Sequence, residues 1–256
     1  MKTRIISGIV MGLIVAAVLA LGFMWEPIVI TIAISVLAVV AVYELLHNAA
    51  GIKNAEVLVG AGLFAFVISA ANFICEDIGQ AIMIIFFAAI FYNVYAAIMV
   101  LKNHGKFGLG RMVSIYTLPI TYGVAFFCLG GIINHNNGIY YLLLLLNFSS
   151  VCDMGAYFVG VTLGKHKLCP ALSPKKTVEG AIGGIISSLI VTVILSLCFD
   201  KNIWLTLLLT VPFCALGMIG DLFASAIKRV VGIKDYGNLI PGHGGVMDRL
   251  DSILMI

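Results

Sequence analysis

The chain has 256 residues, of which 62% are hydrophobic and only 11% are charged, and its formal net charge is +3. Soluble globular domains contain roughly 25% charged residues, so this composition excludes an ordinary soluble fold. The net charge is too small to indicate a nucleic-acid partner. Several continuous apolar runs approach the ~20 residues that cross a bilayer, whereas barrel strands would alternate. We therefore predict an all-α, polytopic integral membrane protein, whose spans are helices rather than strands.

The predicted transmembrane helices follow one another with short connections. The first run begins at Ile5 after two basic residues, and we interpret it as an uncleaved helix rather than a signal peptide. Residues 25–27 are expected to form an interfacial turn. Further spans are predicted at about 28–46, 57–74, 80–100, 113–133, 139–159, 181–199 and 203–220. A last helix is expected to begin near Gly244 and to be truncated at Ile256, which makes about eight or nine spans in total.

Basic residues are unevenly distributed between the two sides that these spans define. With the N-terminus in the cytoplasm, the outer loops contain one basic residue, Lys201, and the inner side contains the other fourteen of the fifteen. Cytoplasmic loops of membrane proteins are enriched in Lys and Arg. We therefore predict that the N-terminus, the loop 160–180 and the stretch 221–251 face the cytoplasm. Residues 1–138 would form a helical frame, and residues 139–256 a second half with polar loops that face the cytoplasm.

The stretch 221–251 is the one long polar passage of the chain. It contains four carboxylates and a histidine among basic residues and glycines: Asp221, Asp235, Asp248, Asp251 and His243, with Lys228, Arg229, Lys234 and Arg249. Carboxylates three residues apart share one face of a helix, as Asp248 and Asp251 would. Hard oxygen ligands of this kind suit Mg²⁺ together with substrate phosphates. The alternative is that they are interfacial charges paired with the neighbouring basic side chains.

Two further polar groups lie near the predicted cytoplasmic side. Asp153 falls inside an apolar span, so it needs either a hydrogen bond to another helix or a water-filled pocket. The loop 164–184 contains a cluster of lysines, followed by Thr177 and Glu179 at the start of a span. It could bind anionic lipid headgroups without catalysis, or hold phosphate oxygens at a helix N-terminus. The spacing of Gly180 and Gly184 is typical of a helix-packing face.

His243 lies in the short sequence Pro-Gly-His-Gly-Gly, residues 241–245. Glycine-rich loops of this kind expose backbone N–H groups that can surround an anion. A single histidine at a membrane interface is also commonly a residue with purely structural hydrogen bonds. Both interpretations remain open from the residues alone.

The polar residues of this half occur in a dense and ordered pattern: Ser225, Ile227, Lys228-Arg229, Lys234-Asp235, Gly237, Ile240-Pro241, His243-Gly244-Gly245, Asp248-Arg249 and Asp251. This pattern resembles the signature of the CDP-diacylglycerol synthases (phosphatidate cytidylyltransferases). The segments Ser173 to Gly180 and Gly220 to Leu222 are similar to further blocks of that family. The resemblance covers about residues 150–251, and the first five spans are generic. Family chains continue further beyond the last aspartate, hence the expected truncation.

The resemblance implies transfer of a cytidylyl group from CTP to phosphatidic acid, giving CDP-diacylglycerol and pyrophosphate. It implies Mg²⁺ and a second cation as cofactors, a membrane-embedded cavity that opens to cytoplasm and lipid, and the ability to form homodimers. The implied metal ligands are Asp221, Asp248 and Asp251, and the implied catalytic residues are Asp221, Asp248, Lys228 and Lys234. The implied substrate-binding residues are Lys175, Lys176, Thr177, Glu179, Ser225, Arg229, Asp235, His243, Arg249 and Asp153.

Elementary chemistry is compatible with that reaction. A phosphate monoester is already ionised near neutral pH, since its second pKa is about 6, so it needs little help from a general base. The sequence contains no evident Ser–His pair, which fits phosphate attack better than hydrolysis.

Two alternatives remain: a CTP-dependent lipid kinase, which would release CDP, and an ion-coupled transporter that uses Asp153. Transporters tend to contain internal repeats, and none is evident here.

Overall fold

The computed structural model describes residues 2–24, 28–75, 77–103, 107–170 and 172–256, with residues 2–6, 23 and 24 described as backbone only. The predicted interfacial turn at 25–27 lies outside the described residues. Within them, seven helices are long and apolar enough to cross a membrane. This confirms the polytopic, predominantly α-helical fold. The residues group into two compact units, Met1–Asn134 with Ile233–Arg249 and His135–Gly232 with Leu250–Ile256, which we call the first and second units.

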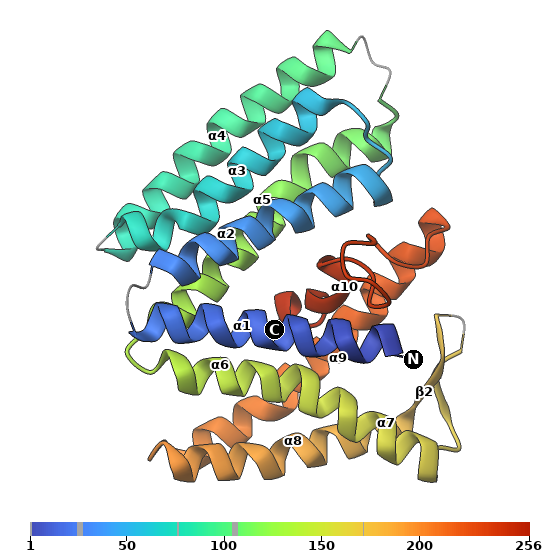
Figure 1. The fold of residues 1–256 in the computed structure, drawn as a ribbon. Helices are drawn as coiled ribbons and strands as arrows, with labels where there is room; N and C mark the ends of the chain where they lie inside the picture. Colours follow the sequence, from blue (N-terminus) through green and yellow to red (C-terminus); the bar gives the residue numbers. More distant parts are fainter. Residues whose placement is uncertain (1, 25–27, 76, 104–106, 171) are drawn as a thin grey trace. The chain divides into compact units, whose positions relative to one another are not determined.

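Among the described residues, the N-terminal part of the first unit, up to Asn134, forms five helices and a π-helical turn. These elements are α1 (Lys2–Met24), α2 (Ile28–Tyr43), η1 (Glu44–Ala49), α3 (Ala55–Ile74), α4 (Ile78–Lys102) and α5 (Leu109–Asn134). Helices α2, α3 and α5 pack together around small, fully buried side chains such as Ala38, Ala61 and Ala65 (Figure 1). Small residues let helix backbones approach closely, which is how membrane helices associate.

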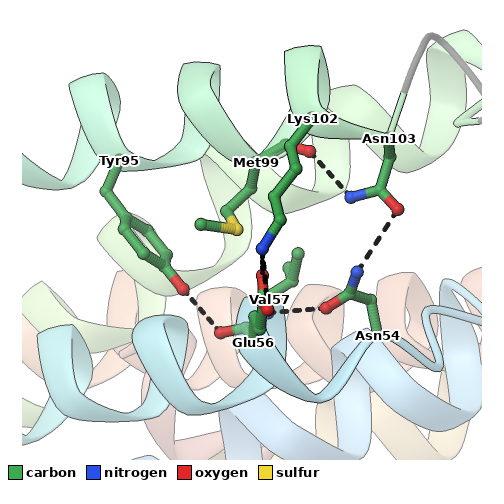
Figure 2. A network of polar contacts seen from close by, with 7 residues as sticks. All are labelled: Asn54, Glu56, Val57, Tyr95, Met99, Lys102 and Asn103. Atoms are coloured by element: carbon green, nitrogen blue, oxygen red, sulfur yellow. Dashed lines mark hydrogen bonds and ion pairs between the residues drawn. The ribbon is translucent and has the colours of Figure 1, made fainter.

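A polar network joins the start of α3 to the end of α4 (Figure 2). The Lys102 amino group lies 2.7 Å from a carboxylate oxygen of Glu56, and the Tyr95 hydroxyl donates to the Glu56 carbonyl at 2.6 Å. Asn54 caps α3 by accepting from the Val57 N–H. The side chains of Lys102 and Glu56 are both more than half exposed, so these charged groups can remain hydrated.

The second unit contains four helices, a π-helical turn and a small hairpin. These elements are α6 (Gly138–Leu146), η2 (Asn147–Val151), α7 (Cys152–Leu163), β1 (Lys167–Cys169), β2 (Ser173–Thr177), α8 (Val178–Cys198) and α9 (Ile203–Val231). Buried hydroxyl and amide groups link the helices, as when the Asn147 amide donates to the Thr192 hydroxyl at 3.0 Å. Such interhelical hydrogen bonds satisfy polar groups that cannot reach water.

The structure differs from the sequence-based expectation in three places. The loop before α8 forms the short antiparallel hairpin β1–β2, an element that the prediction did not include. The hairpin lies outside the spans, where strand edges are not exposed to lipid.

Helix α9 continues beyond the predicted end of its span to Val231, where Gly232 caps it with φ 77°. The last helix, α10 (Met247–Leu250), is much shorter than expected and is followed by the 3-10 turn η3 (Ile253–Met255).

Candidate active site

The predicted site residues fall in both units, and each unit is described by itself. The first unit contains Lys234, Asp235, His243, Asp248 and Arg249. The second contains Asp153, Lys175, Lys176, Thr177, Glu179, Asp221, Ser225, Lys228, Arg229 and Asp251. The predicted division at residue 138 stays a prediction, and the structural grouping places residues 233–249 with the N-terminal helices.

In the first unit, the loop 233–246 surrounds a pocket of about 500 Å³. The residues that line it include Lys234, Asp235, His243 and Arg249, together with Gly242 and Gly244. Four of the predicted site residues therefore meet in one cavity. Cationic side chains and glycine backbone together can bind an anionic ligand.

His243 is held in this pocket by a contact with α1. The Ser7 hydroxyl donates a hydrogen bond to the Pro241 carbonyl at 2.8 Å and lies 2.9 Å from the His243 Nδ1. A hydroxyl has one proton, so with that proton on Pro241 the oxygen accepts from the Nδ1–H of the imidazole.

Asp248 organises the loop through the backbone. It is only 7% exposed, and its Oδ2 accepts from the Tyr236 N–H at 2.7 Å and from the Gly245 N–H at 3.0 Å. Gly244 has φ +89°, and a Cβ added there would lie 2.8 Å from the same oxygen. The approach of the loop to this carboxylate therefore requires glycine. Its predicted role as a metal ligand stays a prediction.

A second buried carboxylate, Glu44, was missed by the sequence reasoning. It lies in η1, is 4% exposed, and accepts from the N–H groups of Val246 and Met247 at 3.1 and 2.9 Å. The sequence does contain a signal for it, because Glu44 is an isolated acidic residue in a long apolar run. Placing such a side chain in a membrane span costs free energy unless it has polar partners.

In the second unit, two lysine–carboxylate pairs lie at the end of α9. The Lys176 amino group lies 2.5 Å from Asp221, and that of Lys228 lies 3.8 Å from Asp251. A Cβ added at Gly220 would lie 3.1 Å from the Asp251 carbonyl oxygen, so the last residues of the chain pack directly against the helix turn that carries Asp221. Spacing alone did not predict which lysine meets which aspartate.

Asp153 belongs to the same cluster. Both Lys176 and Asp221 interact electrostatically with its carboxyl group. The structure thus brings Asp153, Lys176 and Asp221 together from α7, β2 and α9. Ser225 lies on the same helix face as Asp221 and Lys228, because α9 is continuous through all three.

Thr177 and Glu179 make local contacts at the start of α8. The Thr177 hydroxyl accepts from the Gly180 N–H at 3.1 Å and caps the helix. Glu179 accepts from the backbone N–H groups of Lys165 and His166, and it pairs with the His166 imidazole at 2.6 Å. These contacts fix the base of the hairpin. Substrate binding by Thr177 and Glu179 stays a prediction.

The remaining predicted residues of the second unit are Lys175 and Arg229, whose side chains are exposed.

Gly180 and Gly184 pack α8 against α7. An added Cβ would lie 2.7 Å from a carbonyl oxygen of α7 at Gly180 and 2.5 Å from another at Gly184. The packing interpretation of this glycine pair is therefore confirmed. Throughout the part of the chain that the structure describes, no group of three or more His, Cys, Asp or Glu side chains is arranged to hold a metal ion.

Comparison with known proteins supports the resemblance. The model of the cytidylyltransferase family matches residues 2–256. A protein of Staphylococcus aureus named phosphatidate cytidylyltransferase is 32% identical over 261 aligned residues, which cover 100% of this chain and 96% of that relative. A Staphylococcus haemolyticus protein of the same name is 46% identical over 123 residues, a segment that spans only 47% of its length and 47% of this chain. The match over the whole chain shows that this protein belongs to the cytidylyltransferase family.

Proposed function

We propose that this protein is a nucleotidyltransferase that converts CTP and phosphatidic acid into CDP-diacylglycerol and pyrophosphate, in phospholipid biosynthesis. The observation that carries the proposal is the cluster of Lys176, Lys228, Asp221 and Asp251 at the end of α9. Two anionic phosphate compounds repel each other, and cationic side chains together with carboxylate-bound metal are what such a reaction needs. Membership of the cytidylyltransferase family supports the same substrates.

The reaction is a displacement at phosphorus. An oxygen of the lipid phosphate attacks the α-phosphorus of CTP, the bond from this phosphorus to the β-bridging oxygen breaks, and pyrophosphate leaves with the electron pair. Lys176 and Lys228 would neutralise phosphate oxygens as the two substrates approach. The pocket of Lys234, His243 and Arg249 would hold a further anionic group of a substrate. No general base is required, since the attacking phosphate is already ionised.

Mg²⁺ is part of the proposal, and the donor set fits it. Magnesium commonly uses one or two protein carboxylates and takes its other ligands from water and substrate phosphates. Asp221 and Asp251 lie in one unit and are each paired with a lysine that could turn to a substrate phosphate instead. These two aspartates would hold the ion, and Asp248, in the first unit, remains a predicted ligand from the resemblance alone. When bound, the ion would neutralise charge that develops on the phosphate oxygens. A second cation and a homodimer remain further parts of the proposal.

The first test is a turnover assay in detergent micelles that contain the full chain, CTP, phosphatidic acid and Mg²⁺, with pyrophosphate and CDP measured separately. Pyrophosphate whose formation depends on lipid and on Mg²⁺ is the expected result. Formation of CDP without pyrophosphate would replace the proposal with a lipid kinase. If neither product forms, transport through a path that includes Asp153 becomes the hypothesis to examine.

A further inference from the structure

We propose that Glu44 and Asn48 are positioning residues that hold the loop 233–246 in the shape that its pocket requires. The inference rests on the proposed function, because the loop carries Lys234, Asp235 and His243. Neither Glu44 nor Asn48 belongs to the polar stretch 221–251. Both lie in η1, about 190 residues or more from the loop in sequence.

The first step is the contact that Glu44 makes. Its two carboxylate oxygens bind different backbone groups: Oε1 accepts from Val246 N–H at 3.1 Å, and Oε2 accepts from Met247 N–H at 2.9 Å. Val246 ends the loop and Met247 is the first residue of α10, so Glu44 binds the backbone where the loop meets this short helix. A carboxylate that accepts two backbone N–H groups makes strong, charge-assisted hydrogen bonds.

The second step is the contact of Asn48 at the other end of the loop. Its side-chain amide donates to the Tyr236 carbonyl at 2.6 Å. The N–H of the same residue donates to Asp248 at 2.7 Å. Both polar backbone groups of Tyr236 are therefore fixed, one from η1 and one from the start of α10. Glu44 and Asn48 together hold the two ends of the pocket loop.

The third step is steric. Side chains at Gly237 and Gly245 would overlap the Glu44 carboxyl group, since an added Cβ at either position would lie in contact with it. Two glycines from separate parts of the loop thus leave room for one carboxylate. The loop and Glu44 are complementary in shape as well as in hydrogen bonding.

The geometry of η1 explains how both residues reach the loop. A π-helical turn widens the helix by one residue per turn and is frequent at functional sites. Glu44 and Asn48 are four residues apart in this turn, and both side chains contact loop backbone. Burying a carboxylate in a membrane-spanning segment costs free energy, and such residues typically have a function. We infer that this cost is tolerated because the Glu44 carboxylate orders the pocket.

The test is the variant Glu44→Gln, with Glu56→Gln as its matched control. Glutamine keeps the shape of Glu44 but places an NH₂ donor against one of the two backbone N–H donors. Glu56 belongs to the same unit, its side chain is 52% exposed, and it lies in the network of Figure 2. Asn48→Asp is the companion variant, because it places a carboxylate oxygen against the Tyr236 carbonyl oxygen.

Two measurements are made on the full chain in detergent. Hydrogen exchange of peptides that cover residues 236–248 should become faster in Glu44→Gln and Asn48→Asp, while peptides from α3 and α9 keep their protection. With CTP and phosphatidic acid, kcat should fall about 100-fold, the effect expected from ångström-scale misplacement of site residues. Glu56→Gln should leave both readouts at their wild-type values.

Unchanged exchange at 236–248 in Glu44→Gln would overturn the inference, whatever the activity. Faster exchange throughout the protein would also overturn it, because it would assign Glu44 a general role in stability. If the wild-type protein produces no pyrophosphate, the proposed function fails, and the exchange measurement still decides whether Glu44 and Asn48 hold the loop.

Discussion

At the scale of single residues, the three aspartates that the sequence treats alike have different surroundings. Asp221 pairs with Lys176, Asp251 lies near Lys228, and Asp248 accepts two backbone N–H groups. Asp221 and Asp251 each have a lysine ammonium group as partner, and substrate phosphates could compete with the aspartates for these lysines. Asp248 instead shapes the loop, so its substitution should affect structure as well as reactivity.

The variant Asp221→Asn should lose activity by about 100-fold or more, because a metal ion's stabilisation of transition-state charge is worth several kcal/mol and each ~1.36 kcal/mol is tenfold in rate. Pyrophosphate release in the micellar assay measures this. Asp200→Asn is the matched control: Asp200 is exposed in the same unit with φ 51°, a conformation that asparagine tolerates. Full activity in Asp221→Asn would refute its assignment as a metal ligand.

At the scale of elements, the second unit depends on the close packing of α7 and α8. Glycines at the interface allow backbone carbonyls of one helix to approach the other. The N-terminus of α8 is in turn capped by Thr177 at the end of β2. Because Lys175 and Lys176 precede this cap in the same strand, the position of the cationic side chains depends on how α8 begins.

Replacement of Gly184 by alanine should destabilise the protein. The new Cβ would lie 2.5 Å from the Cys152 carbonyl oxygen and 3.1 Å from the Ala156 Cβ. Overpacking typically costs about 1–3 kcal/mol, which corresponds to a fall of several degrees in apparent Tm. Thermal unfolding in detergent measures it. The control is Gly12→Ala in α1, where no atom lies within 4 Å of the added Cβ; equal melting of both variants would contradict the packing argument.

The cap at Thr177 allows a separation of structural and substrate-binding roles. Thr177→Ala should lower stability by about 1 kcal/mol, the usual effect of losing an N-cap side chain. Thr177→Ser keeps the hydroxyl that accepts from Gly180 N–H, so it should retain the wild-type melting temperature. If alanine changes neither melting nor activity, the hydroxyl has neither role.

At the scale of the whole molecule, charge distribution predicts the orientation in the membrane. Residue 136 should lie outside the cell and residue 166 inside it, since loop 160–180 holds several lysines. Alkaline phosphatase, which is active outside, should therefore be active when fused after residue 136 and inactive after residue 166. A fluorescent protein that folds only in the cytoplasm should give the opposite result at both positions. The reverse pattern would place the lysines of the hairpin outside, away from cytoplasmic CTP, and would overturn the predicted orientation.

The sequence by itself determined the helical spans, because a bilayer requires about 20 apolar residues for each crossing and leaves little freedom in where they begin. It also indicated the polar residues of the site, since charges in so apolar a chain are few and concentrated. It missed the hairpin at 167–177, whose pairing depends on strand contacts across a turn rather than on a periodic pattern.

Only the tertiary structure decided the partners of the charged groups. Lys176 meets Asp221 and Glu44 meets Val246 and Met247 across long stretches of chain, and such contacts depend on how helices pack, which periodicity does not encode. The structure also revealed that α9 runs unbroken through Asp221, Ser225 and Lys228. Local apolar pattern thus specifies membrane spans, whereas the geometry of the site arises from long-range packing and from the need of each buried polar group for a partner.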